Sequence, residues 1–296
     1  MEPSDHDEPE AAGARRLTST LPEFQSARGM LVSLAYRLLG SWHDAEDVLQ
    51  ETYVRWSGVD RATVVEPRRY LTRVVTRLAI DVLRTRQARR ESYQGEWLPE
   101  PAPSDPFAEV DTSDLSLAVL HLMERLTPPQ RAVYVLRTAF ELPYDEIADI
   151  LGRSAEDCRQ LHKRASTALD RDRPRFEPTP AEQRRLLLDF VAAARDGDLA
   201  RLEAMLQESV HEWSDGGGKR GIARKPLVGR EQVATFFRRI YDDRELSVVP
   251  LELVTGPALD VRVPGYRHVL HLVIDGDRIA EIRIQANPAK LSALGW

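Results

Sequence analysis

A proline-rich segment in the first half of the chain sets the strongest limit on its fold. Residues 92–110, SYQGEWLPEPAPSDPFAEV, contain four prolines and show no amphipathic period. Proline fixes φ and lacks a backbone donor, so this stretch suits neither a helix interior nor a central strand. We therefore expect an extended interdomain linker over residues 92–112. Trp97 and Leu98 are larger and more apolar than a spacer needs, which leaves incidental packing and a docking element as alternatives.

The chain before the linker has a helical pattern. Apolar residues recur at three- and four-residue intervals in three stretches, residues 30–39, 43–56 and 70–83. Gly40-Ser41 and Pro67 separate these stretches. We therefore expect residues 21–91 to form a helical domain. Residues 1–20 contain five acids and hardly any large apolar residue, a composition that predicts a disordered tail.

Helices resume after the linker, over residues 113–176. The stretch YDEIADILGRSAEDCRQLHKRASTAL contains Gly152, which permits a tight reversal, and Ser154, which can cap a following helix. At about 100° per residue, the outward face of that helix carries Glu156, Arg159, Gln160, Lys163 and Thr167. A short helix, a glycine turn and a helix with a basic outer face predict a helix-turn-helix. An αα-hairpin inside a helical bundle is the alternative.

The last third of the chain changes to a mixed pattern. Residues 181–207 predict two amphipathic helices, and residues 230–241 predict another. Alternating segments then predict antiparallel strands, namely LSVVPLELV, LDVRV, RHVLHLVI and RIAEIRIQ. Asp275-Gly276 forms the expected hairpin turn between the last two. We therefore expect residues 180–296 to form an α+β domain.

Charge is segregated along the chain, although the formal net charge is −6. Residues 61–90 hold nine arginines and two acids, and residues 159–175 hold six bases and two acids. Four acids lie between Asp44 and Glu51, in a stretch without a base. Such blocks indicate different partners for different faces, whereas ordinary solvated helix faces are the alternative.

Composition also excludes several classes of protein. The single cysteine, Cys158, rules out an intramolecular disulfide framework and a cysteine-rich zinc site. The polar N-terminus lacks the apolar stretch of a signal peptide, and no run approaches the ~20 apolar residues of a membrane span. We expect a cytoplasmic protein without a membrane segment, a metal or a cofactor.

Several motifs give the chain a family resemblance. The segments AEDVLQETYVRW, RRYLTRVVTRLAIDVLRTRQARR and LPYDEIADILGRSAEDCRQLHKRA resemble regions two and four of extracytoplasmic-function (ECF) sigma factors. WLPEP in the linker, DGGGK at 215–219 and NPAKL at 287–291 resemble hallmarks of a branch with a C-terminal SnoaL-like domain. Ala289 replaces an acid of the family's NPDKL pattern, and Arg77 stands where many members have asparagine.

The resemblance implies a fold and a function. The fold is multidomain: all-α sigma domains two and four, the latter with the helix-turn-helix, and a C-terminal α+β SnoaL-like cone. The function is that of an alternative sigma factor, not an enzyme, which binds the β and β′ subunits of core RNA polymerase. It directs recognition of the −10 and −35 elements of promoter DNA and transcription initiation. The C-terminal domain modulates this activity in cis.

The resemblance also assigns roles to individual residues. Polymerase binding falls on Asp44, Asp47, Gln50 and Glu51. Contact with −10 DNA falls on Arg68, Arg69, Thr72, Arg73, Thr76 and Arg77. Contact with −35 DNA falls on Arg153, Glu156, Arg159, Gln160, Lys163 and Arg164. The regulatory interface comprises Trp97, Leu98, Pro99, Asp215, Gly216, Gly217, Gly218, Lys219, Asn287 and Pro288. Trp56 and Tyr70 are either base-stacking groups or core aromatics.

The C-terminal domain leaves alternatives open. Five side chains could line a cavity for chemistry or for a small-molecule ligand: His211, Asp215, Tyr241, His268 and His271. No pair of them has the sequence spacing of a catalytic motif, so regulation is favoured over catalysis. A ligand-sensing helix-turn-helix regulator would explain a cavity domain but not an acidic helix followed by an arginine-rich one. A SnoaL-like enzyme with DNA-binding appendages is the third alternative.

Overall fold

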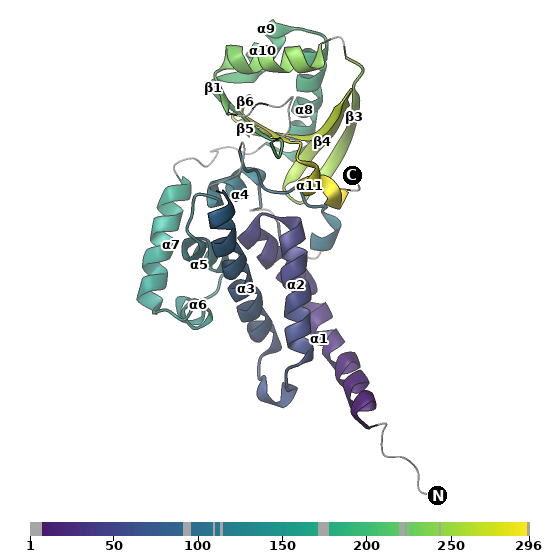
Figure 1. Ribbon diagram of the computed structural model, residues 1–296. Helices are drawn as coiled ribbons and strands as arrows, with labels where there is room; N and C mark the ends of the chain where they lie inside the picture. Colours follow the sequence, from purple (N-terminus) through teal and green to yellow (C-terminus); the bar gives the residue numbers. More distant parts are fainter. Residues whose placement is uncertain are drawn as a thin grey trace, which may run out of the picture.

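The chain folds into two helical units below a mixed α/β unit (Figure 1). The computed structural model describes residues 8–90, 96–108, 110–112, 115–170, 178–218, 223, 225–242 and 244–294, with the backbone alone at 8–21, 61 and 87–90. Within these ranges no helix is both long enough and apolar enough to cross a membrane.

The first unit consists of three long helices. They are α1 (Glu8–Leu39), α2 (Trp42–Ser57) and α3 (Pro67–Arg90), with a 3₁₀ turn, η1 (Arg61–Thr63), before α3. Gly40 ends α1 with a φ of 61°, and the Ser41 hydroxyl caps α2 by accepting from the Asp44 amide at 3.2 Å. Helix α1 extends into residues 1–20, the expected disordered tail, where good helix formers such as EAAGARRL outweigh the acidic composition. Residues 1–7 lie outside the described ranges.

The second unit contains four shorter helices. They are α4 (Leu117–Met123), α5 (Pro128–Thr138), α6 (Tyr144–Leu151) and α7 (Ala155–Asp170). Thr127 and Gln130 form a capping box at the start of α5. Between α6 and α7, Gly152 adopts the left-handed conformation, with a φ of 66°, and the Ser154 hydroxyl accepts from the Asp157 amide at 3.1 Å. These local signals give the expected helix-turn-helix.

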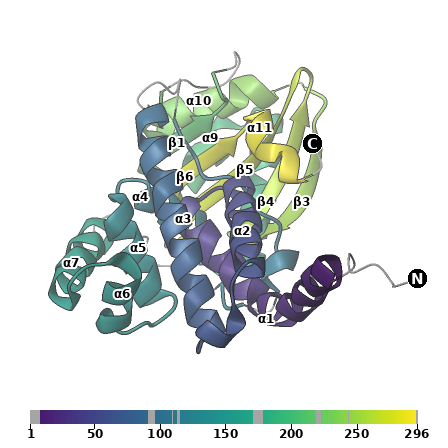
Figure 2. The same cartoon turned by 60° about the horizontal axis from the view of Figure 1, so that its bottom comes forward.

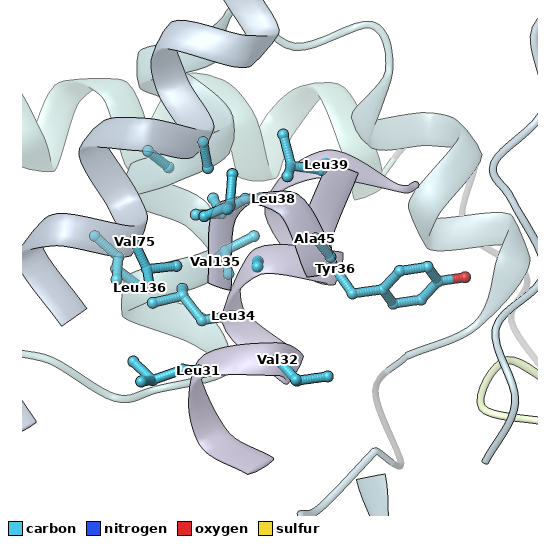
Figure 3. Close-up of a cluster of buried hydrophobic side chains, with 14 of the residues drawn as sticks. Leu31, Val32, Leu34, Tyr36, Leu38, Leu39, Ala45, Val75, Val135 and Leu136 are labelled. Carbon is cyan, nitrogen blue, oxygen red and sulfur yellow. The ribbon is translucent and has the colours of Figure 1, made fainter. Parts of the chain in front are cut away.

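The two helical units share one hydrophobic core. Leu34 and Leu38 of α1, Val75 of α3, and Val135 and Leu136 of α5 belong to a single buried cluster (Figure 3). Burying a side chain of this size stabilises the fold by roughly 1.5–3 kcal/mol. Separating the two units would therefore expose apolar surface that is covered here.

The third unit is a curved mixed sheet covered on one face by helices (Figure 1). Its helices are α8 (Pro180–Arg195), α9 (Leu199–Met205), α10 (Arg230–Tyr241) and the short α11 (Pro288–Leu291), followed by η3 (Ser292–Leu294). Its strands are β1 (Leu206–Asp215), β2 (Leu227–Val228), β3 (Ser247–Leu253), β4 (Gly256–Val263), β5 (Tyr266–Asp275) and β6 (Arg278–Gln285). The strand order is β2-β1-β6-β5-β4-β3. The strands from β3 to β6 pair antiparallel as expected, whereas β1 and β6 pair parallel, a long-range contact that local patterns do not encode.

The outer face of this sheet, away from α8 and α10, is directed at the helical units and the linker (Figure 2). Strand alternation sends successive side chains to opposite faces. Leu270 and Leu272 pack under the helices, while Val269 and Leu291 lie in a small separate cluster. The linker runs along this boundary and includes a 3₁₀ turn, η2 (Asp105–Phe107).

Candidate polymerase, DNA and interdomain interfaces

Helix α2 presents part of its acidic face to solvent. Asp47, Gln50 and Glu51 are exposed, and the first two line a shallow groove of about 400 Å³. Glu51 pairs with Arg55 one turn later at 2.8 Å. Asp44 is paired with Arg86 of α3. Asp47 and Gln50 are therefore the most accessible of the four residues predicted to bind polymerase.

The groove beside Asp47 includes residues that the sequence did not single out. Phe24 and Arg28 of α1 contribute one wall, and Leu49 and Tyr53 of α2 contribute apolar surface. Phe24 packs edge-on against Tyr53, with ring centroids 5.2 Å apart. A helical pattern shows which residues share a face, but not which neighbouring helix completes a groove.

The basic face of α3 lies against α6. Arg69 donates through Nη2 to the Asp149 carboxylate at 2.8 Å. Arg73 donates to the Asp149 carbonyl at 2.9 Å, and Arg77 donates to the Ile150 carbonyl at 3.1 Å. The final carbonyls of a helix lack intrahelical donors and carry partial negative charge, so arginines suit this position. Three of the residues predicted to contact −10 DNA are thus engaged by the helix-turn-helix unit.

The other three predicted −10 residues are placed differently. Thr72 and Thr76 are buried, and their hydroxyls donate to carbonyls one turn earlier on α3. The Arg68 side chain is exposed. Trp56 is buried and packs on Tyr70 with ring centroids 5.6 Å apart. Both aromatics therefore serve the core in this arrangement.

The polar face of α7 is open to solvent. All six residues predicted to contact −35 DNA are exposed: Arg153, Glu156, Arg159, Gln160, Lys163 and Arg164. Glu156 accepts from Arg159 at 3.3 Å and from Gln160 at 3.4 Å. His162 lies on the flank of the helix and makes contacts at 3.2 Å with the Tyr144 hydroxyl and 3.3 Å with the Thr138 hydroxyl. It packs within the unit.

The linker is held by a group that we call the linker latch, comprising the Leu98 backbone and the side chains of Asp215, Gln285 and Lys290. The Leu98 amide donates to Asp215 at 3.1 Å. Lys290 donates to Asp215 at 2.6 Å and to the Leu98 carbonyl at 2.8 Å. Gln285 donates to the carbonyls of Leu98 and Pro99 at 3.4 and 3.3 Å. The Lys290 ammonium also lies 3.3 Å from the centroid of the Trp97 ring, a cation–π contact.

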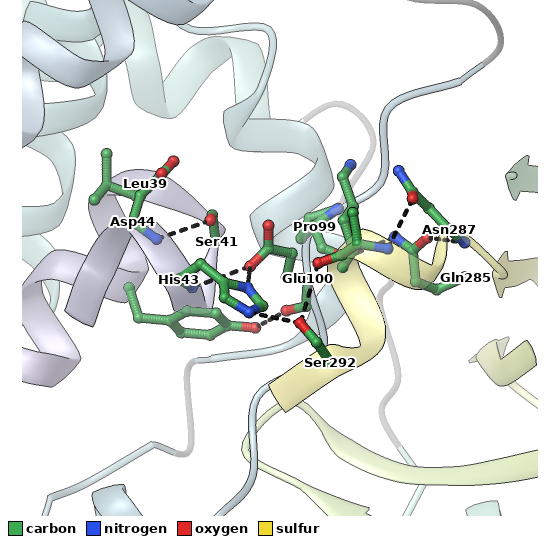
Figure 4. A network of polar contacts seen from close by, with 12 residues as sticks. Leu39, Ser41, His43, Asp44, Pro99, Glu100, Gln285, Asn287 and Ser292 are labelled. Atoms are coloured by element: carbon green, nitrogen blue, oxygen red, sulfur yellow. Dashed lines mark hydrogen bonds and ion pairs between the residues drawn. The ribbon is translucent and has the colours of Figure 1, made fainter. Parts of the chain in front are cut away.

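A second set of contacts ties the linker to the junction between α1 and α2 (Figure 4). The Tyr36 hydroxyl donates to the Glu100 carbonyl at 2.6 Å. The His43 amide donates to the Glu100 carboxylate at 3.1 Å, and the His43 ring lies 3.0 Å from the same oxygen. The other ring nitrogen of His43 lies 2.7 Å from the Ser292 hydroxyl. The end of the chain, the linker and the first helical unit therefore meet at His43.

The linker also follows the turn between β3 and β4. Pro103 forms an isolated bridge with Leu253, and the Val254 amide donates to the Ala102 carbonyl at 3.1 Å. Beyond this point Phe107 packs between Tyr36 and Trp42 in the helical core. The linker is thus buried at residues 98–102 and again at Phe107.

Among its described residues, the glycine loop approaches the C-terminal motif at Gly217. A Cβ on Gly217 would lie 2.7–2.9 Å from the side-chain atoms of Asn287, and Gly217 and Gly218 have φ values of 60° and 80°. Asp215, at the start of the motif, is the residue that reaches the linker. Lys219 lies outside the described ranges.

The C-terminal motif is built as a short capped helix. Asn287 caps α11 by accepting from the Ala289 amide at 3.1 Å. Pro288 and Ala289 are exposed. Replacing the acid of the family's NPDKL pattern by Ala289 therefore leaves no buried group without its partner. Lys290 is the member of this motif that points into the latch. The motif NPAKL could have identified Lys290, and the motif WLPEP could have identified Glu100, whereas Gln285 lies in neither motif.

The five side chains considered for chemistry do not converge. Tyr241 and His268 meet between the sheet and α10, where the hydroxyl lies 2.6 Å from the imidazole Nε2. His211, Asp215 and His271 occupy odd positions of β1 and β5, on the outer face of the sheet. Burial lowers the pKa of His268 to about 3, so this imidazole is neutral.

A buried carboxylate that the sequence did not single out lies inside the cone. Glu212 is fully buried and accepts from the Ser214 hydroxyl. Burial raises the pKa of Glu212 to about 7, against the lowering effect of the Ser214 hydrogen bond. In the described part of the chain, no group of three or more His, Cys, Asp or Glu side chains could hold a metal ion.

The two helical units define a class of transcription factor. Residues 24–89 match the family model for sigma-70 region 2, and residues 116–169 match that for sigma-70 region 4. The arrangement of an acidic helix, a basic helix and a helix-turn-helix follows the order of these regions. The chain is therefore a sigma-70-type initiation factor.

Comparison with known proteins gives the family. The chain is 33% identical over 290 residues to the ECF RNA polymerase sigma factor SigJ of Mycobacterium tuberculosis, covering 91% of this chain and 92% of that one. It is 31% identical over 278 residues to the probable ECF RNA polymerase sigma factor SigI of the same organism, covering 92% and 94%. The crystal structure of M. tuberculosis SigJ superposes with a TM-score of 0.73 at 29% identity, covering 92% of this chain and 98% of that one. The chain belongs to the ECF sigma factors.

Membership confirms the main expectations drawn from the sequence. The protein is an alternative sigma factor that acts in promoter recognition and transcription initiation, and it is not an enzyme. Its fold comprises two all-α sigma domains and a C-terminal α+β domain, as predicted. The first helical unit is accordingly domain two, the second is domain four, and the mixed α/β unit is the C-terminal domain.

Proposed function

We propose that the C-terminal domain restrains this sigma factor in a closed form by clamping the linker between domains two and four. In the closed form, α6 of domain four covers the −10-binding face of α3. The observation that carries the proposal is the Lys290 ammonium, which bonds at once to Asp215 of the C-terminal domain and to the Leu98 carbonyl of the linker. Movement of domain four away from domain two requires the linker to leave this site.

In the open form the three binding faces act on separate partners. Asp47, Gln50 and Glu51 of α2 bind the core polymerase in the cytoplasm, where acids favour association with a basic surface. Arg68, Arg69, Arg73 and Arg77 of α3 neutralise the phosphates of melted −10 DNA. The outer face of α7 enters the major groove at the −35 element. Because these DNA contacts are largely ionic, promoter binding weakens steeply with salt.

The hydrogen bonds that Arg73 and Arg77 make to α6 indicate which DNA contacts the closed form blocks. Arg73 and Arg77 cannot bind phosphate while they donate to the last carbonyls of α6. The polar face of α7 is exposed in the same arrangement. The closed form is therefore competent for −35 contact but not for capture of the −10 strand.

Run-off transcription with core polymerase tests the proposal. The test variant is the full chain carrying Asp215→Asn and Lys290→Met, which loosens the latch without leaving an unpaired buried charge. The matched control carries Asp189→Asn and Arg201→Met, which removes an exposed pair at 3.5 Å between α8 and α9. We expect several-fold more promoter-dependent transcript from the latch variant than from wild type or control. An equal or smaller yield from a folded latch variant would contradict restraint by the latch.

A further inference from the structure

A cavity lies outside the cone, between the outer face of the sheet and the approach to domain four. Its volume is about 410 Å³, within the range of small-molecule sites. Four segments far apart in the sequence line it: residues 115–118 before and within α4, residues 178–183 at the start of α8, the β3–β4 turn at 253–257, and strands β5 and β6. It is separate from the space between the sheet and α10 that holds Tyr241 and His268.

Three polar side chains of this cavity have atoms without a hydrogen-bond partner among the described residues. Arg283 is 1% exposed, and its Nε and Nη1 groups have no hydrogen-bond partner there. His271, directly opposite Arg283 in the β5–β6 pair, is 5% exposed and has an unpartnered Nε2. The Thr255 hydroxyl is likewise buried without a partner in the described ranges. Buried polar groups are nearly always hydrogen-bonded, so these atoms point to a missing partner.

The electrostatic character of this wall is positive. Arg283 is bonded to Glu281 through Nη2 alone. Burial lowers the pKa of His271 to about 3, and Arg283 contributes to the lowering, so the imidazole is neutral. A neutral imidazole and a hydroxyl can each donate one hydrogen bond, and the guanidinium can donate from two nitrogens, Nε and Nη1. The set is made of donors and suits an anionic oxygen.

Part of the remaining wall is apolar, and Thr112, Ser116 and Gln183 also line it. Leu117, Val254, Pro257 and Ile274 line the cavity beside these donors. An inorganic ion would leave this surface uncovered, whereas an apolar body would bury it. The contacts therefore specify an anionic head joined to a short hydrocarbon chain or ring.

We propose that this cavity binds a small organic anion, whose head accepts hydrogen bonds from Arg283 and Thr255 and whose apolar body packs on Leu117 and Val254. Because both the sheet and the residues leading into α4 line the site, the bound anion joins the C-terminal domain to domain four. The ligand therefore strengthens the closed form, a consequence that rests on the proposed function. The binding site itself does not depend on it.

Calorimetric titration of the full chain tests the site with three probes of equal chain length: octanoate, octyl phosphate and 1-octanol. We expect saturable binding of at least one anion, and binding of 1-octanol at least tenfold weaker. The stronger of the two anions identifies the head group as carboxylate or phosphate. No binding of either anion, or equal binding of 1-octanol, would overturn the proposal.

Two variants and one control assign the binding to this cavity. Arg283→Met is expected to weaken anion binding at least tenfold, and Thr255→Val, a smaller change that keeps the fold, is expected to weaken it several-fold. Arg262→Met is the control, because Arg262 lies half-exposed on β4 outside the cavity and its partner Asp260 keeps Arg267. Unchanged binding in both cavity variants would overturn the assignment.

Transcription separates the two proposals. The anion that binds is added to the run-off assay with wild type and with Thr255→Val. If the anion lowers the transcript yield with wild type but not with Thr255→Val, the ligand strengthens the closed form. Calorimetric binding with no effect on transcript keeps the site and rejects its link to the closed form.

Discussion

The Lys290 ammonium lies 2.6 Å from the Asp215 carboxylate, and both side chains are buried beneath the linker. Burial lowers the pKa of Lys290 to about 8, although Asp215 opposes that change. Trp97 covers the ammonium from the linker side. Three motifs that are far apart in the sequence, WLPEP, DGGGK and NPAKL, therefore meet at one buried ion pair. The pair would be largely solvated without the linker above it.

The first prediction concerns this ion pair. Lys290→Met leaves the Asp215 carboxylate buried without its cation, a change that typically costs 3–5 kcal/mol. The double variant Asp215→Asn, Lys290→Met removes both charges and should cost much less than the single variant. Urea unfolding followed by far-UV circular dichroism measures the free energy of unfolding of both variants. If the single variant is no less stable than the double variant, the pair is not buried as described.

The second prediction concerns the glycine loop. At Gly217 a left-handed conformation costs an L-residue roughly 1–2 kcal/mol, and a new Cβ would also push Asn287 aside. Gly217→Ala should therefore destabilise the C-terminal domain by about 2 kcal/mol or more and speed hydrogen exchange at the Leu98 amide.

Gly216→Ala provides the matched control, because Gly216 has no positive φ in the structure. It should leave both stability and exchange close to wild type. Equal effects at the two positions would show that the loop acts through general flexibility and not through its approach to Asn287.

The sequence allowed much of the fold to be predicted because the relevant signals are local. The reversal at Gly152, the cap at Ser154 and the hairpin at Asp275-Gly276 each depend on a few neighbouring residues. The contact between the basic face of α3 and α6 could not be predicted, since an arginine-rich face suits DNA and helix carbonyls equally. The role of Arg283 could not be predicted either, because a charged side chain on the outer face of a sheet is ordinarily solvated. Only the three-dimensional arrangement shows that the linker and α4 cover it.

The third prediction concerns the contact between α3 and α6. Replacing Arg73 and Arg77 by alanine removes two hydrogen bonds to the last turn of α6. The double variant should increase hydrogen exchange in the last turn of α6 and raise the radius of gyration of the free protein measured by small-angle X-ray scattering. Arg68→Ala is the control, because Arg68 is exposed on the same helix without contacting α6. Identical scattering from all three proteins would show that these arginines do not hold the domains together.

The fourth prediction concerns pH and the buried carboxylate of Glu212. Burial raises the pKa of Glu212 from 4.5 to about 7 in the folded protein. Between these values the folded state binds a proton that the unfolded chain does not, so the free energy of unfolding falls as pH rises through this window. At about 1.4 kcal/mol per pKa unit, the loss relative to Glu212→Gln should approach about 3 kcal/mol.

Comparison with Glu212→Gln isolates this effect from the buried histidines. The pKa values of His268 and His271 are lowered to about 3, so these groups make stability rise with pH between about 3 and 6.5 in both proteins. Their contribution cancels in the difference between variant and wild type. Urea unfolding of both proteins at pH 5, 6, 7 and 8 measures that difference, which should grow in favour of the glutamine variant up to about pH 7 and then level off. Parallel profiles would mean that Glu212 is solvated and titrates as an ordinary surface carboxylate.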